Sequence, residues 1–191
     1  MKENIIQAVT KEIHQRGLRF SIRDVASQLG ISTKTVYQHF ESKEQMISSI
    51  VEHAVKDMMD IEKEVMANDT LSLQEKLYRA LTVLPRRFVF QDVRILDELR
   101  QRYPQQWKVL DDYMNNGWNG ILLLVEQGVE EGALKPFDME LFISVYVGAL
   151  YQLMDQKRSD SRRMSLEEAL AGMVDFLMYG ITKQSPGKSY S

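Results

Sequence analysis

The chain has 191 residues, of which 44% are hydrophobic and 27% are charged, an ordinary composition for a globular protein. It contains no cysteine, which excludes a disulfide framework and a thiolate nucleophile or zinc ligand. The formal net charge of -3 argues against an affinity of the whole molecule for nucleic acid. Any DNA binding must therefore be concentrated in one part of the chain.

No targeting or membrane segment is predicted. The N-terminal residues lack the continuous apolar stretch of a signal peptide. The longest nearly apolar run, Leu141–Met154, has 14 residues, whereas a membrane span needs about 20. We therefore expect a cytoplasmic protein with no membrane partner, in which this run forms a buried core helix.

Apolar residues recur at a spacing near 3.6 along every long segment, so the sequence predicts an all-α protein. Helices are expected over residues 3–16, 22–29, 33–40, 43–66, 73–91, 92–102, 105–131, 138–156 and 165–182. Connections are expected at 68–72, 134–137 and 159–163. The polar tail, residues 184–191, is expected to be disordered.

Capping signals mark the short helices near the N-terminus. Ser21 is placed as an N-cap, with Asp24 at the third helical position to complete a capping box. Gly30 follows this helix and begins a turn. Ser42 and Gln45 predict a second capping box, which opens the long helix that follows.

The third predicted helix, capped by Ser32 or Thr33, is typical of a probe for DNA. Val36 and Phe40 are four residues apart and face inward. The outward side offers hydroxyls, an ammonium and an amide, which suit base edges and phosphates; these belong to Thr33, Lys34, Tyr37 and Gln38. Residues 21–40 thus predict a helix-turn-helix. Residues 1–48 have a net charge of +2 and the remainder -5, so the head is the basic part.

This stretch resembles the N-terminal domain of the TetR/AcrR family of bacterial transcriptional regulators over roughly the first 50 residues. The matching elements are Asp24-Val25-Ala26, Gly30-Ile31-Ser32, Val36-Tyr37, His39-Phe40 and Lys43-Glu44. Beyond them the resemblance is architectural. It implies a DNA-binding domain over residues 1–60, with a three-helix head that contains the helix-turn-helix, and a helical effector-binding and dimerisation domain over residues 61–183.

The resemblance also implies a set of DNA-binding residues: Ser21, Ser32, Thr33, Lys34, Thr35, Tyr37, Gln38, His39 and Lys43. Thr33, Lys34 and Thr35 would lie at the base-reading end, and Tyr37, His39 and Lys43 would reach phosphates. Lys34 departs from the family, in which a small residue is common at this position; it reads guanine or adds phosphate affinity. Gln38 stands where an aromatic residue is common, which changes or removes a contact.

Aromatic and methionine side chains concentrate in the body, where most are expected to form the core. The resemblance implies an effector pocket there, and we expect a small apolar or aromatic effector. The candidate ligand contacts are Phe88, Arg94, Trp107, Tyr113, Trp118 and Tyr146. Arg86 and Asp97 are further candidate polar anchors.

The segment Leu141–Met154 is apolar on nearly all sides, and other surfaces must cover it. Together with the apolar stripe of the last helix, it predicts a homodimer through a four-helix bundle about a two-fold axis. The expected interface residues are Leu141, Val145, Gly148, Ala149, Met173 and Leu177. The alternative is that both helices lie at the centre of a monomeric bundle.

The chain lacks the motifs of an enzyme: there is no Gly-rich phosphate loop and no nucleophile elbow. His14, His39 and His53 are scattered, so neither a metal nor another cofactor is expected. The predicted function is a sequence-specific regulator that binds double-stranded operator DNA as a homodimer and responds to a ligand, acting as a repressor. Activation remains open, and the alternatives are a helical protein-interaction module and an enzyme of small molecules.

Overall fold

The computed structural model describes residues 1–86, 93–154 and 165–182, and within these ranges the chain is nearly all helical. The predicted all-α fold is confirmed. The helices are α1 (Lys2–Arg16), α2 (Ile22–Leu29), α3 (Thr33–Tyr37), α4 (Lys43–Met66), α5 (Leu73–Leu81), α6 (Val93–Arg102), α7 (Pro104–Asn116), α8 (Asn119–Glu130), α9 (Met139–Met154) and α10 (Leu166–Ile181), with a short 3-10 helix η1 (Gly17–Arg19) after α1.

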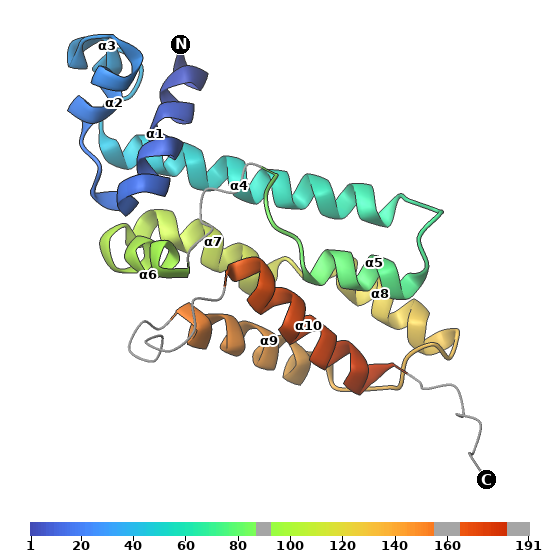
Figure 1. The fold of residues 1–191 in the computed structure, drawn as a ribbon. Helices are drawn as coiled ribbons and strands as arrows, with labels where there is room; N and C mark the ends of the chain where they lie inside the picture. Colours follow the sequence, from blue (N-terminus) through green and yellow to red (C-terminus); the bar gives the residue numbers. More distant parts are fainter. Residues whose placement is uncertain (87–92, 155–164, 183–191) are drawn as a thin grey trace.

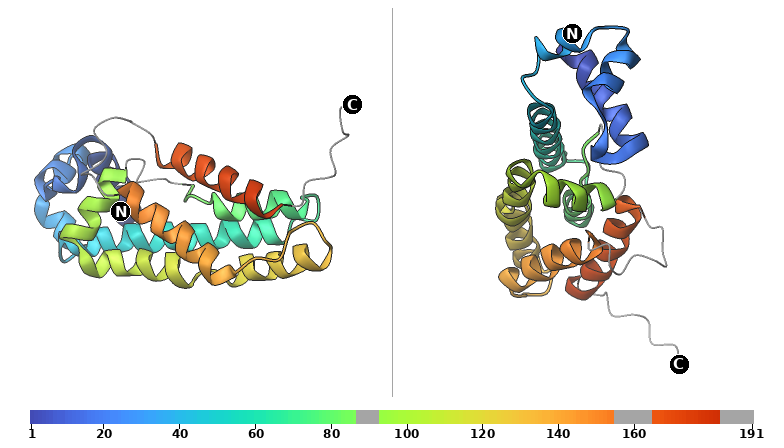
Figure 2. Two further views of the ribbon diagram at one scale, coloured as in Figure 1. Left: turned by 90° about the horizontal axis from the view of Figure 1, so that it is seen from below. Right: turned by 90° about the vertical axis from the view of Figure 1, so that its left-hand side faces the viewer.

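Helix α4 joins the two parts of the molecule. Helices α1–α3 form a head at one end of α4, and α5–α10 form a body along the rest of its length (Figure 1). In the right-hand view of Figure 2 the head lies on one side of α4 and the body on the other. Helix α4 packs against α7 and α5, and α5 in turn packs against α8 and α10.

One hydrophobic core runs from the head into the body. Ile5 and Val9 of α1 and Ile47 of α4 belong to the same buried cluster as Leu99 of α6 and Leu110 of α7. A second cluster fills the far end of the body, with residues of α5, α8, α9 and α10. The border predicted at residue 60 lies within α4, so a continuous helix and a shared core connect the two proposed domains. The predicted tail, 184–191, lies outside the described residues.

The single helix predicted over residues 105–131 is wrong, because the chain forms α7 and α8 with a break at Gly117. A Cβ on Gly117 would lie 2.6 Å from the carbonyl oxygen of Tyr113, so any other residue here would require the backbone to shift. Trp118 follows, and its Nε1 donates to the carbonyl of Met114 at 2.8 Å, which satisfies one of the free carbonyls at the end of α7. The break positions two aromatic side chains of the body.

The helix predicted over residues 73–91 is also too long, because α5 ends at Leu81. Pro85 disfavours helical geometry in the residue before it and cannot donate a backbone hydrogen bond. The hydroxyl of Thr82 donates to the carbonyl of Tyr78 at 2.8 Å and so helps to close the last turn. Residues 82–86 therefore form an irregular segment that runs beside α4, and residues 87–91 lie outside the described part of the chain.

Among the described helices, none is long and apolar enough to cross a membrane.

Candidate DNA interface and effector pocket

The two short helices of the head are held by the caps that the sequence predicts. Ser21 and Asp24 form a reciprocal capping box at the start of α2. Gly30 ends α2 in the left-handed conformation, with φ of 65°, where a side chain would be strained. Ser32, and not Thr33, caps α3, and its hydroxyl accepts from the backbone N–H of Thr35 at 3.1 Å. The helix-turn-helix is thus built from local hydrogen bonds.

Helix α3 presents a polar outer side. Val36 and Phe40 are buried, as predicted, while Lys34 is exposed and 52% of the surface of Tyr37 is accessible. Ser21, Ser32, Thr33 and Gln38 are also exposed, and Thr35 and His39 are half-buried. The helix ends at Tyr37, three residues earlier than predicted, and Gln38 and His39 form a turn. The exposed face offers donors and acceptors of the kind that read base edges and phosphates.

Lys43 lies differently from the other predicted DNA contacts. Its Nζ donates to the carbonyls of Leu18 at 2.7 Å and Phe20 at 2.6 Å, and it lies 4.1 Å from the centre of the Phe20 ring. Burial lowers the pKa of this ammonium, opposed by the nearby charges of Glu98 and Glu44. Two of its three donors therefore hold the head together, and a phosphate contact stays a prediction for the third.

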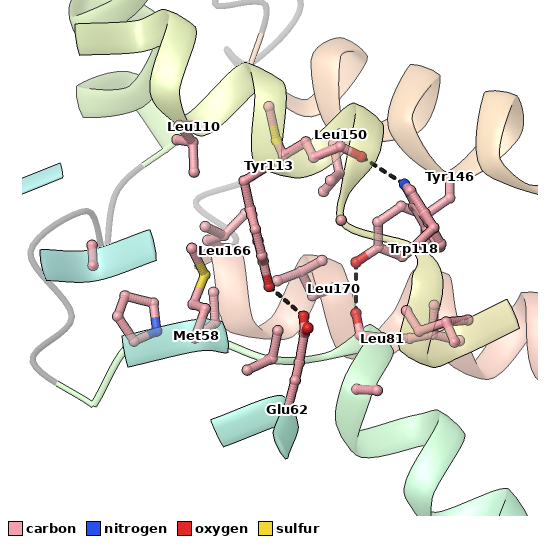
Figure 3. Close-up of a pocket in the computed structure, with 18 of the residues that line it drawn as sticks. Met58, Glu62, Leu81, Leu110, Tyr113, Trp118, Tyr146, Leu150, Leu166 and Leu170 are labelled. Carbon is pink, nitrogen blue, oxygen red and sulfur yellow. Dashed lines mark hydrogen bonds between the residues drawn. The ribbon is translucent and has the colours of Figure 1, made fainter. Parts of the chain in front are cut away.

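The body contains an apolar pocket lined by residues of every helix from α4 to α10, with a cavity volume of about 110 Å³ (Figure 3). It lies where the two hydrophobic clusters meet, because Met58 and Leu110 belong to one and Leu81 and Trp118 to the other. Three of the predicted ligand contacts, Tyr113, Trp118 and Tyr146, line it. The break between α7 and α8 brings the first two to the same cavity.

The polar groups of the pocket are bonded to one another or to backbone. The hydroxyl of Tyr113 donates to the carboxylate of Glu62, and the hydroxyl of Tyr146 donates to the carbonyl of Leu81 at 2.6 Å (Figure 3). Burial raises the pKa of Tyr146, and burial together with the bond to Glu62 raises that of Tyr113. Burial also raises the pKa of Glu62, although the Tyr113 hydrogen bond opposes it.

Glu62 is the residue of this pocket that sequence reasoning missed. It follows Ala54 and Met58 at intervals of four on the buried stripe of α4, and all three line the pocket. An acid on an otherwise apolar helical stripe is expensive to bury and is therefore a signal of a site. That signal is present in the sequence.

Other predicted ligand contacts lie elsewhere. Trp107 is buried against Tyr151, with ring centroids 6.3 Å apart, and does not line the pocket. Arg94 lines a separate cleft between α1 and α6. Asp97 is buried and accepts from Gln101 at 2.6 Å on its own helix. Phe88 lies outside the described residues.

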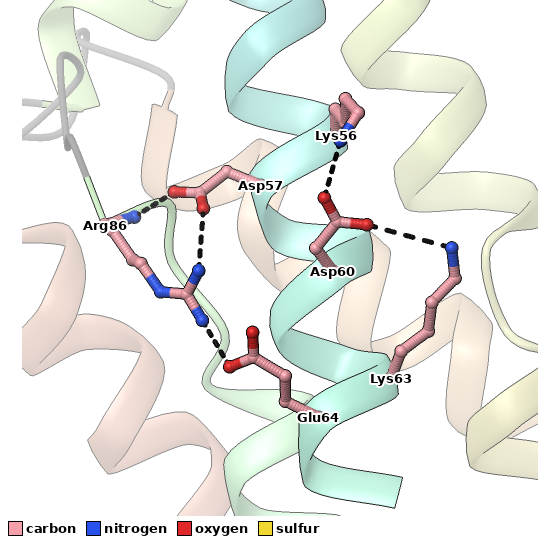
Figure 4. A network of polar contacts seen from close by, with 6 residues as sticks. All are labelled: Lys56, Asp57, Asp60, Lys63, Glu64 and Arg86. Atoms are coloured by element: carbon pink, nitrogen blue, oxygen red, sulfur yellow. Dashed lines mark hydrogen bonds and ion pairs between the residues drawn. The ribbon is translucent and has the colours of Figure 1, made fainter. Parts of the chain in front are cut away.

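Arg86, a further candidate anchor, lies on the outside of α4. Its guanidinium pairs with Glu64 and lies 3.6 Å from Asp57, next to a second network in which Asp60 pairs with Lys56 at 2.7 Å and with Lys63 (Figure 4). These pairs attach the segment after α5 to the surface of α4. They are structural contacts at the surface of α4, and Arg86 does not line the pocket.

Helix α6 connects the pocket to the head. Leu96 lines the pocket, and Glu98 on the same helix accepts from the backbone N–H of Leu18 at 2.9 Å and pairs with Arg19 at 3.3 Å. Gly17 lies directly beneath, where an added Cβ would be 2.8 Å from the Glu98 carboxylate. A displacement of α6 would therefore act directly on the chain between α1 and α2.

An apolar surface covers one side of α9 and α10, and we call it the α9–α10 face. Phe176 and Tyr179 of α10 are 79% and 72% exposed, and Leu141 and Val145 of α9 are exposed as well. Gly148 is exposed too, whereas the other predicted interface residues, Ala149, Met173 and Leu177, are half-buried, and Met173 and Leu177 pack against the core. Phe176 and Tyr179 were not among the predicted interface residues, because the sequence indicates an apolar stripe on a different side of α10.

Comparisons with known proteins agree on the kind of molecule. The family model described as bacterial regulatory proteins, tetR family, matches residues 5–50. The chain is similar to the uncharacterized HTH-type transcriptional regulator YvaF of Bacillus subtilis, with 28% identity over 95% of this chain and 96% of the relative. It is also similar to the HTH-type transcriptional repressor KstR2 of Rhodococcus jostii, with 29% identity over 66% of this chain and 65% of the relative.

A solved structure shares the whole fold. A transcriptional regulator from Saccharomonospora viridis, crystallised in complex with choline, superposes with a TM-score of 0.71 at 21% identity, over 96% of this chain and 98% of that one. At this identity the similarity concerns the fold alone. The head and the body thus occur together in another regulator with the same arrangement of helices.

Proposed function

The chain belongs to the TetR family of bacterial regulatory proteins, and from that premise we propose that it is a ligand-responsive repressor that acts as a homodimer on operator DNA. The observation that carries the proposal is the exposed polar side of α3, held outward by a capped glycine turn within the segment that the family model matches. The similarity to the repressor KstR2 supports repression over activation. A cytoplasmic location and the absence of an enzymatic activity are parts of the same proposal.

In the proposed complex, α3 enters the major groove and the head contacts the flanking phosphates. Thr33, Lys34 and Thr35 read base edges from the start of α3, and Tyr37 and His39 contact phosphates. The exposure of Lys34 and Tyr37 supports these roles, because both side chains are already in solvent and could contact DNA without a change in the core. Ser21 and Ser32 use their hydroxyls as caps, which leaves lone pairs and backbone groups beside the DNA.

The α9–α10 face supports the homodimer. Large exposed aromatic side chains on one helix, with exposed apolar residues on the next, are typical of a protein interface. A second copy related by a two-fold axis would cover Phe176 and Tyr179, and Gly148 would let the helices approach closely, because no atom of its own chain lies within 4 Å of an added Cβ. Two heads then address half-sites separated by about 34 Å, one turn of DNA.

The pocket supports a ligand response. Its apolar and aromatic lining suits an effector with an apolar or aromatic body, and the regulator from Saccharomonospora viridis, which shares the fold, binds choline. Because α6 contacts both the pocket and the head, an effector that displaces Leu96 would shift Glu98 and the chain that it holds. The effector and DNA then weaken each other by the same factor.

Selection of bound fragments from genomic DNA tests the function. Fragments recovered with the parent should share an inverted repeat, and a reporter placed behind the recovered promoter should be repressed by the parent. The variant Lys34→Ala should recover fewer fragments or a relaxed repeat. Recovery of random fragments by the parent, with no common repeat, would contradict the proposal.

A further inference from the structure

The pocket contains one carboxylate on an otherwise apolar wall. Among the described residues that line it, none is lysine, arginine or histidine, and Glu62 has no ion pair with any described residue. Its protein partner is the hydroxyl of Tyr113. A half-buried carboxylate without a cation costs free energy that a bound cation would recover.

The side chains around Glu62 offer acceptors and few donors. The hydroxyl protons of Tyr113 and Tyr146 are donated to Glu62 and to the carbonyl of Leu81, so both oxygens present lone pairs to the cavity. The Nε1 of Trp118 donates to the carbonyl of Met114 at 2.8 Å and is equally committed. A ligand with a carboxylate or a phosphate would meet no free side-chain donor here and would face the charge of Glu62.

The cavity is also limited in size and bounded by aromatic rings. Its volume of about 110 Å³ is of the order of a cavity that holds a single benzene ring. Trp118 and Tyr146 meet edge to face, with ring centroids 5.1 Å apart at 86°. Aromatic faces attract a cation that lies over them, which adds to the attraction of the carboxylate.

We propose that the effector is a protonated amine on a compact apolar body, with its ammonium at Glu62 and its body among the apolar side chains near Met58, Leu110 and Ile121. This inference rests on the proposed role of the pocket as the effector site and defines the charge of its ligand. The ammonium donates hydrogen bonds to the Glu62 carboxylate and to the oxygen of Tyr113 or Tyr146. Glu62 is thereby the residue that selects amines over alcohols and acids.

A matched series of ligands tests the proposal by isothermal titration calorimetry with the full chain at pH 7. Two bodies, 2-phenylethyl and 2-cyclohexylethyl, are each used as the amine and the alcohol, and the corresponding 3-substituted propanoates serve as the acids. We expect an amine to bind about tenfold or more tightly than its alcohol, because only the ammonium adds an ion pair to its hydrogen bond with the Glu62 carboxylate, and the acids not to bind. Equal affinity for the amine and the alcohol, preference for an acid, or no binding of either amine would overturn the proposal.

Two substitutions separate the charge of Glu62 from its volume. Glu62→Gln keeps the size and an acceptor for Tyr113, and it should lower amine affinity about tenfold or more while alcohol affinity changes much less. Glu62→Met serves as the second variant and should bind the alcohols and not the amines. Glu52→Gln removes the same charge from an exposed position of α4 and should bind as the parent does. Unchanged amine affinity in both folded Glu62 variants would refute the role of Glu62.

The same proteins separate this inference from the proposed function. Glu62→Gln should keep the salt-dependent DNA binding of the parent, because Glu62 lies in the body and far from α3 along α4. Failure of the parent to bind DNA would contradict the proposed function as a regulator, whereas the amine titrations would still test the ligand of the pocket. Failure of the amines to bind, with DNA binding intact, would contradict the inference alone.

Discussion

Replacement of Lys43 by methionine tests how the head is held together. The variant keeps the aliphatic stem and removes the ammonium that donates to the carbonyls of Leu18 and Phe20. Each of the two acceptors left without a partner costs about 1–3 kcal/mol, or about 2–6 kcal/mol together, and part of this is offset because the variant no longer buries a charge. We expect a net loss of about 2–4 kcal/mol, a large share of the 5–15 kcal/mol that is typical of domains.

Thermal unfolding followed by circular dichroism measures the effect. For a chain of this length, about 3 kcal/mol corresponds to a fall in Tm of about 6–12 °C. Lys11→Met, at an exposed position of α1, is the matched control and should melt close to the parent. If Lys43→Met melts with the parent and the salt dependence of its DNA binding falls by about one phosphate contact, Lys43 acts on DNA and the structural role is refuted.

Four further outcomes are expected. Lys34→Ala should weaken operator binding and, if Lys34 pairs with guanine, relax the preference at one base pair by about 1–3 kcal/mol, as a binding assay with operator variants measures; unchanged binding to operator and random DNA would contradict the assigned DNA face. Gly148→Arg fits its own chain, so light scattering should show a loss of the dimer, from twice 22.2 kDa towards the chain mass, with helicity unchanged; a dimeric variant would exclude Gly148 from the interface. Glu98→Ala should reduce the ratio of operator Kd values with and without effector, whereas an unchanged ratio would remove α6 from the coupling. Hydrogen bonds from Ser21 hold the pKa of Asp24 below 3.8, so its contribution to stability is present above pH 3.8 and lost as the pH falls through the folded pKa. The difference in Tm between parent and Asp24→Asn should therefore shrink in acid, and a difference that grows would contradict the capping role.

Local signals predicted the head well. The caps Ser21 and Ser32 and the glycine turn act through hydrogen bonds between residues at most a few positions apart, so the sequence alone displays them. The capping box expected at Ser42 is half formed, because Gln45 donates to Ser42 from its backbone but its side chain accepts from Glu41. The hydrogen bonds of Lys43 within the head could not be predicted, because its partners lie up to 25 residues earlier in a fold that periodicity does not reveal.

In the body, helix ends decided what could be predicted. The break between α7 and α8 has a glycine, Gly117, as its signal, and the end of α5 at Leu81 is followed by Pro85. The apolar periodicity that continues on both sides of each break concealed them. Trp107 and Trp118 look alike in sequence, and only the packing of α7 against α9 separates the core residue from the pocket residue. The apolar stripe of α10 is wide, so the sequence does not show which part of it packs against the core and which part is exposed.

The salt dependence of DNA binding shows whether the head neutralises phosphates, and a comparison of two DNA sequences shows whether it reads bases. The parent is titrated onto a selected operator fragment and onto random DNA of the same length, across a series of salt concentrations. We predict that binding weakens steeply as salt rises for both, and that the operator is bound at least about 10³-fold more tightly than random DNA at physiological salt. Affinity that does not change with salt, or equal affinity for both fragments, would show that this chain is not an operator-binding repressor.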